Sequence, residues 1–264
     1  ILLLVYFGML ALKHCQYTNK DTNLRISRYS ATKSDIRRVF FHEDLVMVEF
    51  LGSTHRILQD RFGTQALADR IEQVAVHDKV GTAEKAFIEG RDMFFLASVT
   101  ADGQPTVSYK GGDPGFVRVL SEGEVVFPSY DGNGMYYSMG NIADNAKLGL
   151  LFIDFETPHR LRLEGTATVS HDDPLLVDYP EAQLLVRIAV ARVFVNCPRY
   201  VHRYKRVETS PYVPREGQPA PLAVWKRIDG MLDVLPEGDR DRVADAGGTI
   251  SRQDYADRIL KGDV

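Results

Sequence analysis

Short apolar segments separated by turn residues fill the middle of the chain, from residue 93 to residue 196. Residues 161–169 show the pattern best, because Leu161 and Leu163 alternate with Arg162 and Glu164, as in a half-exposed strand. Strands are predicted over residues 93–99, 105–110, 116–120, 124–130, 148–155, 161–169 and 183–196, with a helix as the alternative for the first half of the last segment. Helices are inserted among these strands and do not alternate with them, which favours a Greek-key barrel over a parallel sheet.

Several helices are predicted beside the strands. Leu67, Ile71 and Val74 form one stripe and predict a helix over residues 65–77, with Thr64 as its N-cap. A further helix is predicted over residues 83–89, with Thr82 as its N-cap and Gly90 after its end. Another is predicted over residues 138–145, with Ser138 as its N-cap. A last one is predicted over residues 198–206. Residues 40–62 show no clean period and predict either a short helix or a hairpin.

The two ends of the chain differ from this middle part. Residues 1–12 are continuously apolar and too few to span a bilayer, and the polar, basic residues that follow show no pattern. We therefore expect residues 1–40 to be a disordered or non-native tail; the alternative is the remainder of a signal or anchor segment. Residues 41–206 are expected to form the barrel domain. Residues 207–264 are expected to form a Pro/Gly-rich extension that covers the ligand pocket or wraps a partner subunit, because this otherwise polar stretch contains Trp225.

Composition narrows the classes of function. With 44% hydrophobic residues, 26% charged residues and a net charge of −4, the chain is an ordinary globular protein with no reason to bind nucleic acid. We expect no membrane partner. Cys15 and Cys197 lie far apart, which argues against a disulfide framework or a zinc site and fits a cytoplasmic location. The histidines form no metal motif, so no metal site is predicted, and the absence of GxGxxG disfavours a Rossmann dinucleotide site.

Four segments, taken in order, are informative about the family. They read ASVTADGQPTVSYKGG, DGNGMYYSMGNIADNAKLGLLFID, HRLRLEGTA and VFVNCPRYVHRY. Their order and spacing resemble the pyridoxamine 5′-phosphate oxidase-like flavoproteins, the FMN-binding split barrels, over roughly residues 41–206. The resemblance implies a mainly β fold with flanking helices, built on a six-stranded antiparallel Greek-key split β-barrel. It also implies a homodimer with FMN bound at the subunit interface.

The resemblance also assigns candidate cofactor-binding residues. Lys110 matches the phosphate-side lysine at the end of the second strand, whereas a solvated strand-end lysine is the alternative. A Gly-, Asn- and Ser-rich segment that opens a helix suits a phosphate, because the backbone N–H groups there are free. For Ser138 a capping role is the alternative, and for Tyr136 and Tyr137 we favour packing over contact with a planar ring. The implied FMN-binding residues are Val107, Ser108, Tyr109, Lys110, Gly132, Asn133, Ser138 and Asn141.

The chain departs from the family pattern at the phosphate site. Met135 and Gly140 stand at positions that are often basic in the family, and Tyr137-Ser138 stands where the oxidases proper have a basic pair. Charge-assisted bonds to phosphate are among the stronger hydrogen bonds. Either other cations compensate, or FMN binds weakly, or the ligand differs. The cations considered for compensation are Lys110, Arg118, Arg160 and Arg162.

The function expected from this resemblance is an FMN-dependent oxidoreductase that acts on a small molecule or a nicotinamide donor. No catalytic residue can be assigned, which fits an enzyme whose cofactor carries the redox chemistry. Trp225-Lys226-Arg227 is only loosely similar to the C-terminal substrate residues of the true oxidases, so oxidation of pyridoxamine phosphate is not expected. The alternatives are a non-catalytic protein that binds or senses flavin or haem, and a deazaflavin (F420)-dependent reductase.

Overall fold

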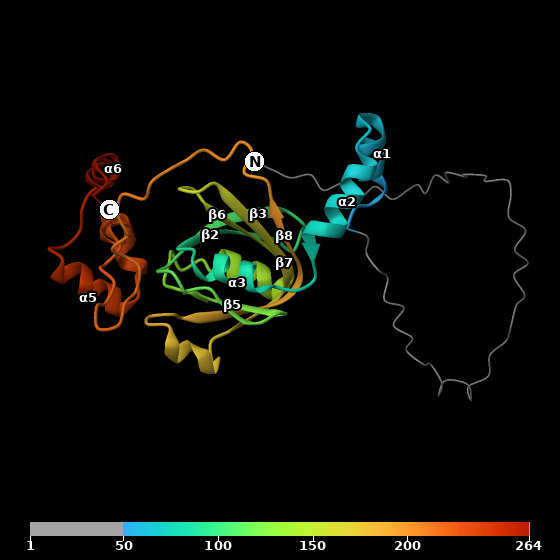
Figure 1. Ribbon diagram of the computed structural model, residues 1–264. Helices are drawn as coiled ribbons and strands as arrows, with labels where there is room; N and C mark the ends of the chain where they lie inside the picture. The colour runs from blue at the N-terminus through green and yellow to red at the C-terminus, as the bar shows by residue number, and fades with distance from the viewer. Residues whose placement is uncertain (1–49, 264) are drawn as a thin grey trace, which may run out of the picture. The chain divides into compact units, whose positions relative to one another are not determined.

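The computed structural model describes residues 50–263 (Figure 1). The predicted tail over residues 1–40 lies outside the described residues. The strands are β1 (Val76–His77), β2 (Met93–Val99), β3 (Pro105–Gly111), β4 (Arg118–Ser121), β5 (Glu124–Ser129), β6 (Lys147–Asp154), β7 (His159–Ser170) and β8 (Leu184–Asn196). The α-helices are α1 (Ser53–Phe62), α2 (Gln65–Ala75), α3 (Thr82–Glu89), α4 (Tyr137–Asp144), α5 (Glu237–Asp245) and α6 (Arg252–Lys261). Three 3₁₀ helices are η1 (Pro174–Asp178), η2 (Val224–Arg227) and η3 (Asp229–Val234).

The strands form one antiparallel sheet in the order β3-β2-β6-β7-β8-β5-β4, and β1 pairs with β8 outside this path. The predicted fold class, mainly β with flanking helices, is confirmed. The sheet has eight strands, whereas the resemblance implied six, and within the described chain β3 and β4 do not pair to close it. The two-residue strand β1 adds to the number, and a strand this short leaves no periodic signal in the sequence.

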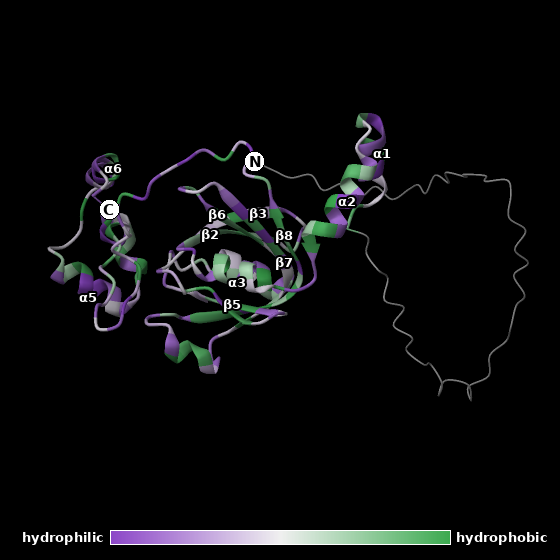
Figure 2. Cartoon of the chain, viewed as in Figure 1, coloured by the Kyte–Doolittle hydropathy of each residue, from purple (hydrophilic) through white to green (hydrophobic). Residues whose placement is uncertain are grey.

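The barrel core forms from the inward positions of these strands. Figure 2 shows apolar residues concentrated in the strands, whereas α5 is mainly polar. The long strand β8 pairs with both β7 and β5, and the predicted strand over residues 183–196 is confirmed. Fully buried side chains of the core include Phe94, Leu96, Phe127, Phe152, Leu161, Leu163 and Ile188. Together they exclude water from the sheet interior, which is the main stabilising contribution to such a fold.

Gly165 lies on β7, at an irregularity in its pairing with β8. The register between the two strands shifts between Glu164 and Gly165, as in a β-bulge. A Cβ atom at Gly165 would lie 2.3 Å from the carbonyl oxygen of Ala189, so only glycine fits without a backbone shift. The closeness of β7 and β8 therefore depends on this residue.

The helix starts predicted at two positions are wrong by one or two residues. Thr82 is the first residue of α3, whose N-cap is Gly81. Ser138 is the second residue of α4, whose N-cap is Tyr136 in the left-handed region at φ 48°. The Ser138 hydroxyl bonds to Ser108 across the fold, so tertiary contact has replaced the capping role.

The predicted helix over residues 198–206 is also wrong. The segment runs without helical structure along the barrel, because its groups bond to distant residues. The backbone N–H of Tyr204 donates to the carbonyl of Phe155, and Arg206 forms an ion pair with Asp92 at 2.5 Å. Arg203 donates to the carbonyl of Glu156. These contacts with the barrel stand in place of the hydrogen bonds that the predicted helix would have made.

Both ends of the described chain are helical. Helix α1 and helix α2 bury no residue, and the predicted stripe of Leu67, Ile71 and Val74 is at least half exposed. The C-terminal extension contains η2, η3, α5 and α6, none of which the sequence pattern predicted as an element. Its apolar residues Leu235 and Val243 are buried. Among the described residues, no helix is long and apolar enough to cross a membrane.

Candidate functional site

A network of polar side chains joins α4 to the hairpin of β2 and β3. The hydroxyls of Ser98 and Thr106 lie 3.0 Å apart, and the side-chain amide of Asn141 donates to Ser98 Oγ at 3.2 Å. The hydroxyls of Ser108 and Ser138 share a hydrogen bond of 3.1 Å. Ser98, Ser138 and Asn141 are buried. The structure thus brings together three of the predicted site residues, Ser108, Ser138 and Asn141.

The same contacts fix the direction of α4 along β3. Asn141 lies beside Thr106, and Ser138, one turn earlier in the helix, lies beside Ser108. The N-terminus of α4 is therefore directed toward the end of β3 that carries Lys110. The first N–H groups of a helix have no partner within it, and the helix dipole favours an anion at that end. This geometry suits a phosphate group near Lys110.

Lys110 shares the inner face of β3 with Thr106 and Ser108. It is paired with Phe94 in the sheet, and Phe94 is fully buried, so the lysine side chain starts from the core face. Its ammonium has no hydrogen-bond or ion-pair partner among residues 50–263, and burial lowers the pKa of Lys110 below its usual value. A half-buried cation without a counter-charge is unfavourable unless a ligand supplies the charge.

Val107 and Tyr109 point away from this network. They are 70% and 62% exposed on the outer face of β3, where the Tyr109 ring packs edge-on against Phe95 at 6.2 Å. Burial, together with the charge of Asp92, raises the pKa of Tyr109. The four consecutive residues predicted on β3 therefore divide between two faces, as strand geometry requires. Only Ser108 and Lys110 lie on the α4 side.

Gly132 and Asn133 lie in the exposed loop before α4 and do not join the network. The side-chain oxygen Oδ1 of Asn133 accepts from the backbone N–H of Met135 at 3.1 Å, so this side chain shapes its own turn. Gly132 lines a separate cavity at the C-terminal extension. The Tyr136 hydroxyl donates to Gln183 Oε1 at 2.8 Å, and Tyr137 remains about half exposed at 52%.

The arginines considered as replacements for the missing cations are engaged elsewhere. Arg118 forms an ion pair with Asp178 at 2.7 Å and stacks over the Tyr179 ring. Arg160 donates to the carbonyl of Cys197 at 3.1 Å, and Arg162 lies over the Phe194 ring. None of these three arginines contacts the α4 network. Of the four candidate cations, Lys110 is the one that shares a strand face with Ser108, a member of the network.

Sequence reasoning missed Ser98 and Thr106, which complete the network. A signal was present, because Thr106 and Ser108 stand two positions apart and so share the inward face of β3, where Ser108 pairs with the buried Leu96 and Thr106 pairs with Ser98. Polar residues at inward strand positions indicate a buried hydrogen-bond network. Among the described residues, no group of three or more histidines, cysteines or carboxylates is placed to hold a metal ion.

Comparisons with known proteins agree with the sequence pattern. The family model described as pyridoxamine 5′-phosphate oxidase matches residues 81–209. No curated protein matches the chain.

Several solved structures are similar to part of the chain. HupZ of Group A Streptococcus is 20% identical with a TM-score of 0.37, over 48% of this chain and 99% of that chain. A Lactobacillus delbrueckii protein named for pyridoxamine 5′-phosphate oxidase is 25% identical with a TM-score of 0.37, over 45% of this chain and 95% of that one. HutZ, the heme storage protein from Vibrio cholerae, is 20% identical with a TM-score of 0.33, over 44% of this chain and 94% of that one.

Proposed function

Because the chain belongs to the pyridoxamine 5′-phosphate oxidase-like family, in which FMN is a common cofactor, we propose that it is a homodimeric FMN-dependent oxidoreductase. Its substrate would be a small organic molecule or a nicotinamide donor. The observation that carries the proposal is the unpaired, half-buried ammonium of Lys110 at the end of β3 toward which α4 is directed. A cation in that setting needs an anionic ligand, and the FMN phosphate is a dianion at neutral pH.

The groups around Lys110 fit the phosphate of FMN. Lys110 would form the ion pair, and the first N–H groups of α4 would donate to the remaining phosphate oxygens. Ser108 and Ser138 each keep a lone pair for a further bond, because a hydroxyl can donate and accept at once. When bound, FMN supplies the redox chemistry, and the protein holds and orients the flavin. Gly132 and Asn133 lie outside this arrangement, in the loop that leads to α4.

The outer face of β3 supports the homodimer part of the proposal. Val107 and Tyr109 are largely exposed there, beside the partly exposed Phe95 and Leu151 on β2 and β6. Exposed apolar residues that adjoin one another on a sheet favour a protein interface over contact with water. A second copy of the chain would cover this face, as the family resemblance implies.

The test is the visible absorption spectrum of the purified full-length protein, before and after addition of FMN, with any released ligand identified by chromatography. We expect a flavin spectrum, and a weaker affinity for FMN in Lys110→Met by about 10- to 100-fold, the usual effect of losing a charge-assisted hydrogen bond. Lys147→Met is the matched control, since Lys147 is exposed at the start of β6. A protein that neither carries nor takes up flavin would contradict the proposal.

A second candidate follows from the low number of cations at the site. Met135 and Gly140 are exposed and uncharged at positions that are often basic in the family. A site with one lysine would suit a protein that holds or senses a flavin or haem without turnover, or a deazaflavin (F420)-dependent reductase. Rapid reduction of the bound flavin by NADH or NADPH would exclude the non-catalytic alternative. Uptake of haem or F420 in place of FMN would favour the corresponding alternative.

A further inference from the structure

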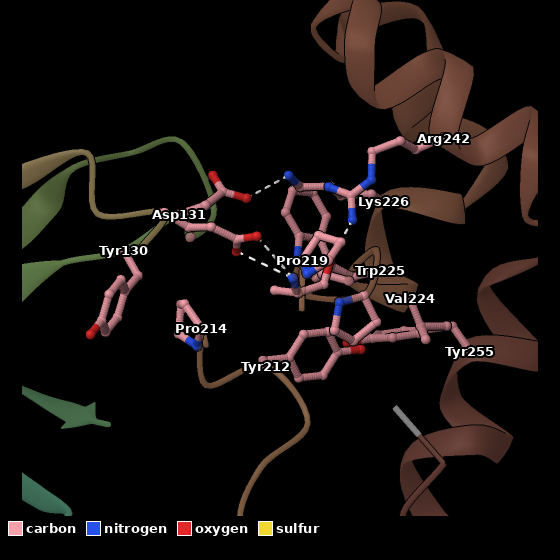
Figure 3. Close-up of a pocket in the computed structure, with 15 residues that line it drawn as sticks. Tyr130, Asp131, Tyr212, Pro214, Pro219, Val224, Trp225, Lys226, Arg242 and Tyr255 are labelled. Atoms are coloured by element: carbon pink, nitrogen blue, oxygen red, sulfur yellow. Dashed lines mark hydrogen bonds and ion pairs between the residues drawn. The ribbon is translucent and has the colours of Figure 1, made fainter. Parts of the chain in front are cut away.

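A second concave site lies where the C-terminal extension meets the barrel. It is a cavity of about 880 Å³, within the size range of small-molecule sites. The barrel contributes the loop after β5 together with Glu181, and the extension contributes residues from Tyr212 to Tyr255 (Figure 3). Of the residues that the resemblance assigns to FMN, Gly132 alone lines this cavity.

Rings make up much of the cavity wall. Tyr130 comes from the barrel side, and Tyr212, Trp225 and Tyr255 come from the extension (Figure 3). Three prolines add flat apolar surfaces between these rings: Pro214, Pro219 and Pro221. Aromatic and proline surfaces of this kind bind planar ring systems by stacking and edge contacts.

Both cations that line the cavity already have acidic partners. The ammonium of Lys226 is buried between Asp131 at 2.7 Å and Asp239 at 2.8 Å. Arg242 donates to the carbonyl of Ala220 at 2.7 Å and lies 4.0 Å from Asp239. An anionic ligand would therefore find no uncompensated positive charge. Glu181 adds a further negative charge to the cavity wall, so it does not favour an anionic ligand either. Its carboxylate accepts from the N–H of Ala220.

Several polar groups of the ring residues remain available. Within residues 50–263, the hydroxyls of Tyr130, Tyr212 and Tyr255 and the indole N–H of Trp225 have no hydrogen-bond partner. Burial raises the pKa of Tyr130 to about 12, so its hydroxyl stays neutral at physiological pH. A ligand with a hydroxyl, carbonyl or amide group could bond to one of these groups while its rings contact the walls.

We infer that this cavity binds an uncharged, planar aromatic molecule that carries a small polar substituent. The binding needs no flavin and is separate from the phosphate site beside Lys110, so the inference goes beyond the proposed function. The paired charges exclude phosphate and carboxylate compounds, and the rings select for flat molecules.

The experiment uses 2-naphthol as the probe and the full-length protein. Equilibrium dialysis gives the Kd, and quenching of Trp225, the single tryptophan of the chain, shows whether the probe occupies the cavity. We expect saturable binding with quenching. We also expect binding of 2-naphthyl phosphate that is weaker by about tenfold or more, because its phosphate would lose water without gaining a cation.

Two variants and one control test the cavity wall. Tyr212→Ala and Tyr255→Ala should each weaken 2-naphthol binding by about tenfold, because each removes an aromatic contact. Tyr200→Ala is the matched control, since Tyr200 is 88% exposed and lies outside the cavity. The inference is overturned if binding is not saturable, if both variants bind as tightly as the unmodified protein, or if 2-naphthyl phosphate binds equally well. Displacement of the probe by FMN would show one shared site and would also overturn it, whereas failure of FMN uptake alone would not.

Discussion

Lys110 is the residue whose environment is hardest to explain without a ligand. Lys110 pairs in the sheet with the buried Phe94, burial lowers its pKa, and no carboxylate among the described residues forms an ion pair with it. Lysines that serve structure alone usually extend to water or to an acidic side chain. An ammonium held in this way stabilises a bound anion more than it stabilises the fold.

The affinity for FMN should depend on pH through Lys110. In the free protein burial lowers the pKa of Lys110 from its usual 10.5, whereas in the complex the phosphate would raise it again. The affinity is therefore constant below the pKa of the free protein and falls as the pH rises through it, beginning below 10.5. Titrations of FMN between neutral and alkaline pH check this. Lys110→Met should lack this dependence, and equal profiles for both proteins would remove the role of Lys110.

Asn141 should matter more for stability than for cofactor contact. It is buried and donates to Ser98, which in turn bonds to Thr106, so its loss leaves α4 less firmly attached to the hairpin. We expect Asn141→Ala to lower the free energy of unfolding by about 1–3 kcal/mol in urea denaturation. Asn133→Ala, an exposed position in the loop before α4, should change it by less than about 0.5 kcal/mol. Equal effects would contradict the network.

At the scale of elements, the strands other than β1 and the start of α2 could be predicted, whereas the starts of α3 and α4 could not. Alternation along β7 and the turn between β2 and β3 depend on neighbouring residues, so the sequence pattern carries them. The N-terminus of α4 depends on the bond from Ser138 to Ser108, thirty positions away. The segment 198–206 likewise has its partners on the barrel, and composition alone suggested a helix. Local pattern predicts an element whose stabilising contacts are local, and fails where they are distant.

The β-bulge between β7 and β8 gives a test at this scale. A Cβ atom at Gly165 would meet the backbone oxygen of Ala189 at 2.3 Å, which cannot move without breaking the sheet register. Gly165→Ala should lower the free energy of unfolding by about 1–3 kcal/mol through overpacking. Gly149→Ala is the matched control on β6, because its Cβ would lie at an ordinary 3.9 Å from the nearest atom. Thermal or urea unfolding of both variants would decide, and equal stabilities would exclude the steric explanation.

For the whole molecule, charged pairs attach the C-terminal extension to the barrel. Arg215 bonds to Asp113 through two hydrogen bonds of 2.8 and 3.0 Å, and Lys226 bonds to Asp131 on the loop after β5. Asp113 and Asp131 lie about a hundred positions before Arg215 and Lys226 in the sequence. The composition of residues 207–264 indicated a Pro/Gly-rich tail, and contacts between such distant positions leave no sign in it. The prediction that the extension covers the flavin pocket stays a prediction, because the cavity that Trp225 lines includes neither Lys110 nor Ser138. Whether it wraps a partner subunit remains a prediction.

Lys226 should be the main attachment point, because its buried ammonium joins the barrel and α5 at once. Burial lowers its pKa, but the hydrogen bonds to Asp131 and Asp239 outweigh this and raise the pKa overall. The ion pairs are therefore complete below the usual 10.5, and are lost only as the pH rises through the raised value. Lys226→Met removes the cation and leaves two carboxylates facing each other. We expect the amide protection of residues 207–245 against hydrogen–deuterium exchange to fall by about tenfold.

The same exchange experiment separates detachment of the extension from general destabilisation. Protection in β6 and β7 should stay unchanged in Lys226→Met, because their hydrogen bonds lie within the sheet. Lys261→Met, at the exposed end of α6, should leave both regions unchanged. If Lys226→Met loosens the strands as much as the extension, the lysine stabilises the whole fold. If neither region changes, the attachment depends on Arg215 and the other contacts, and the cavity at the extension would persist without the buried ion pairs.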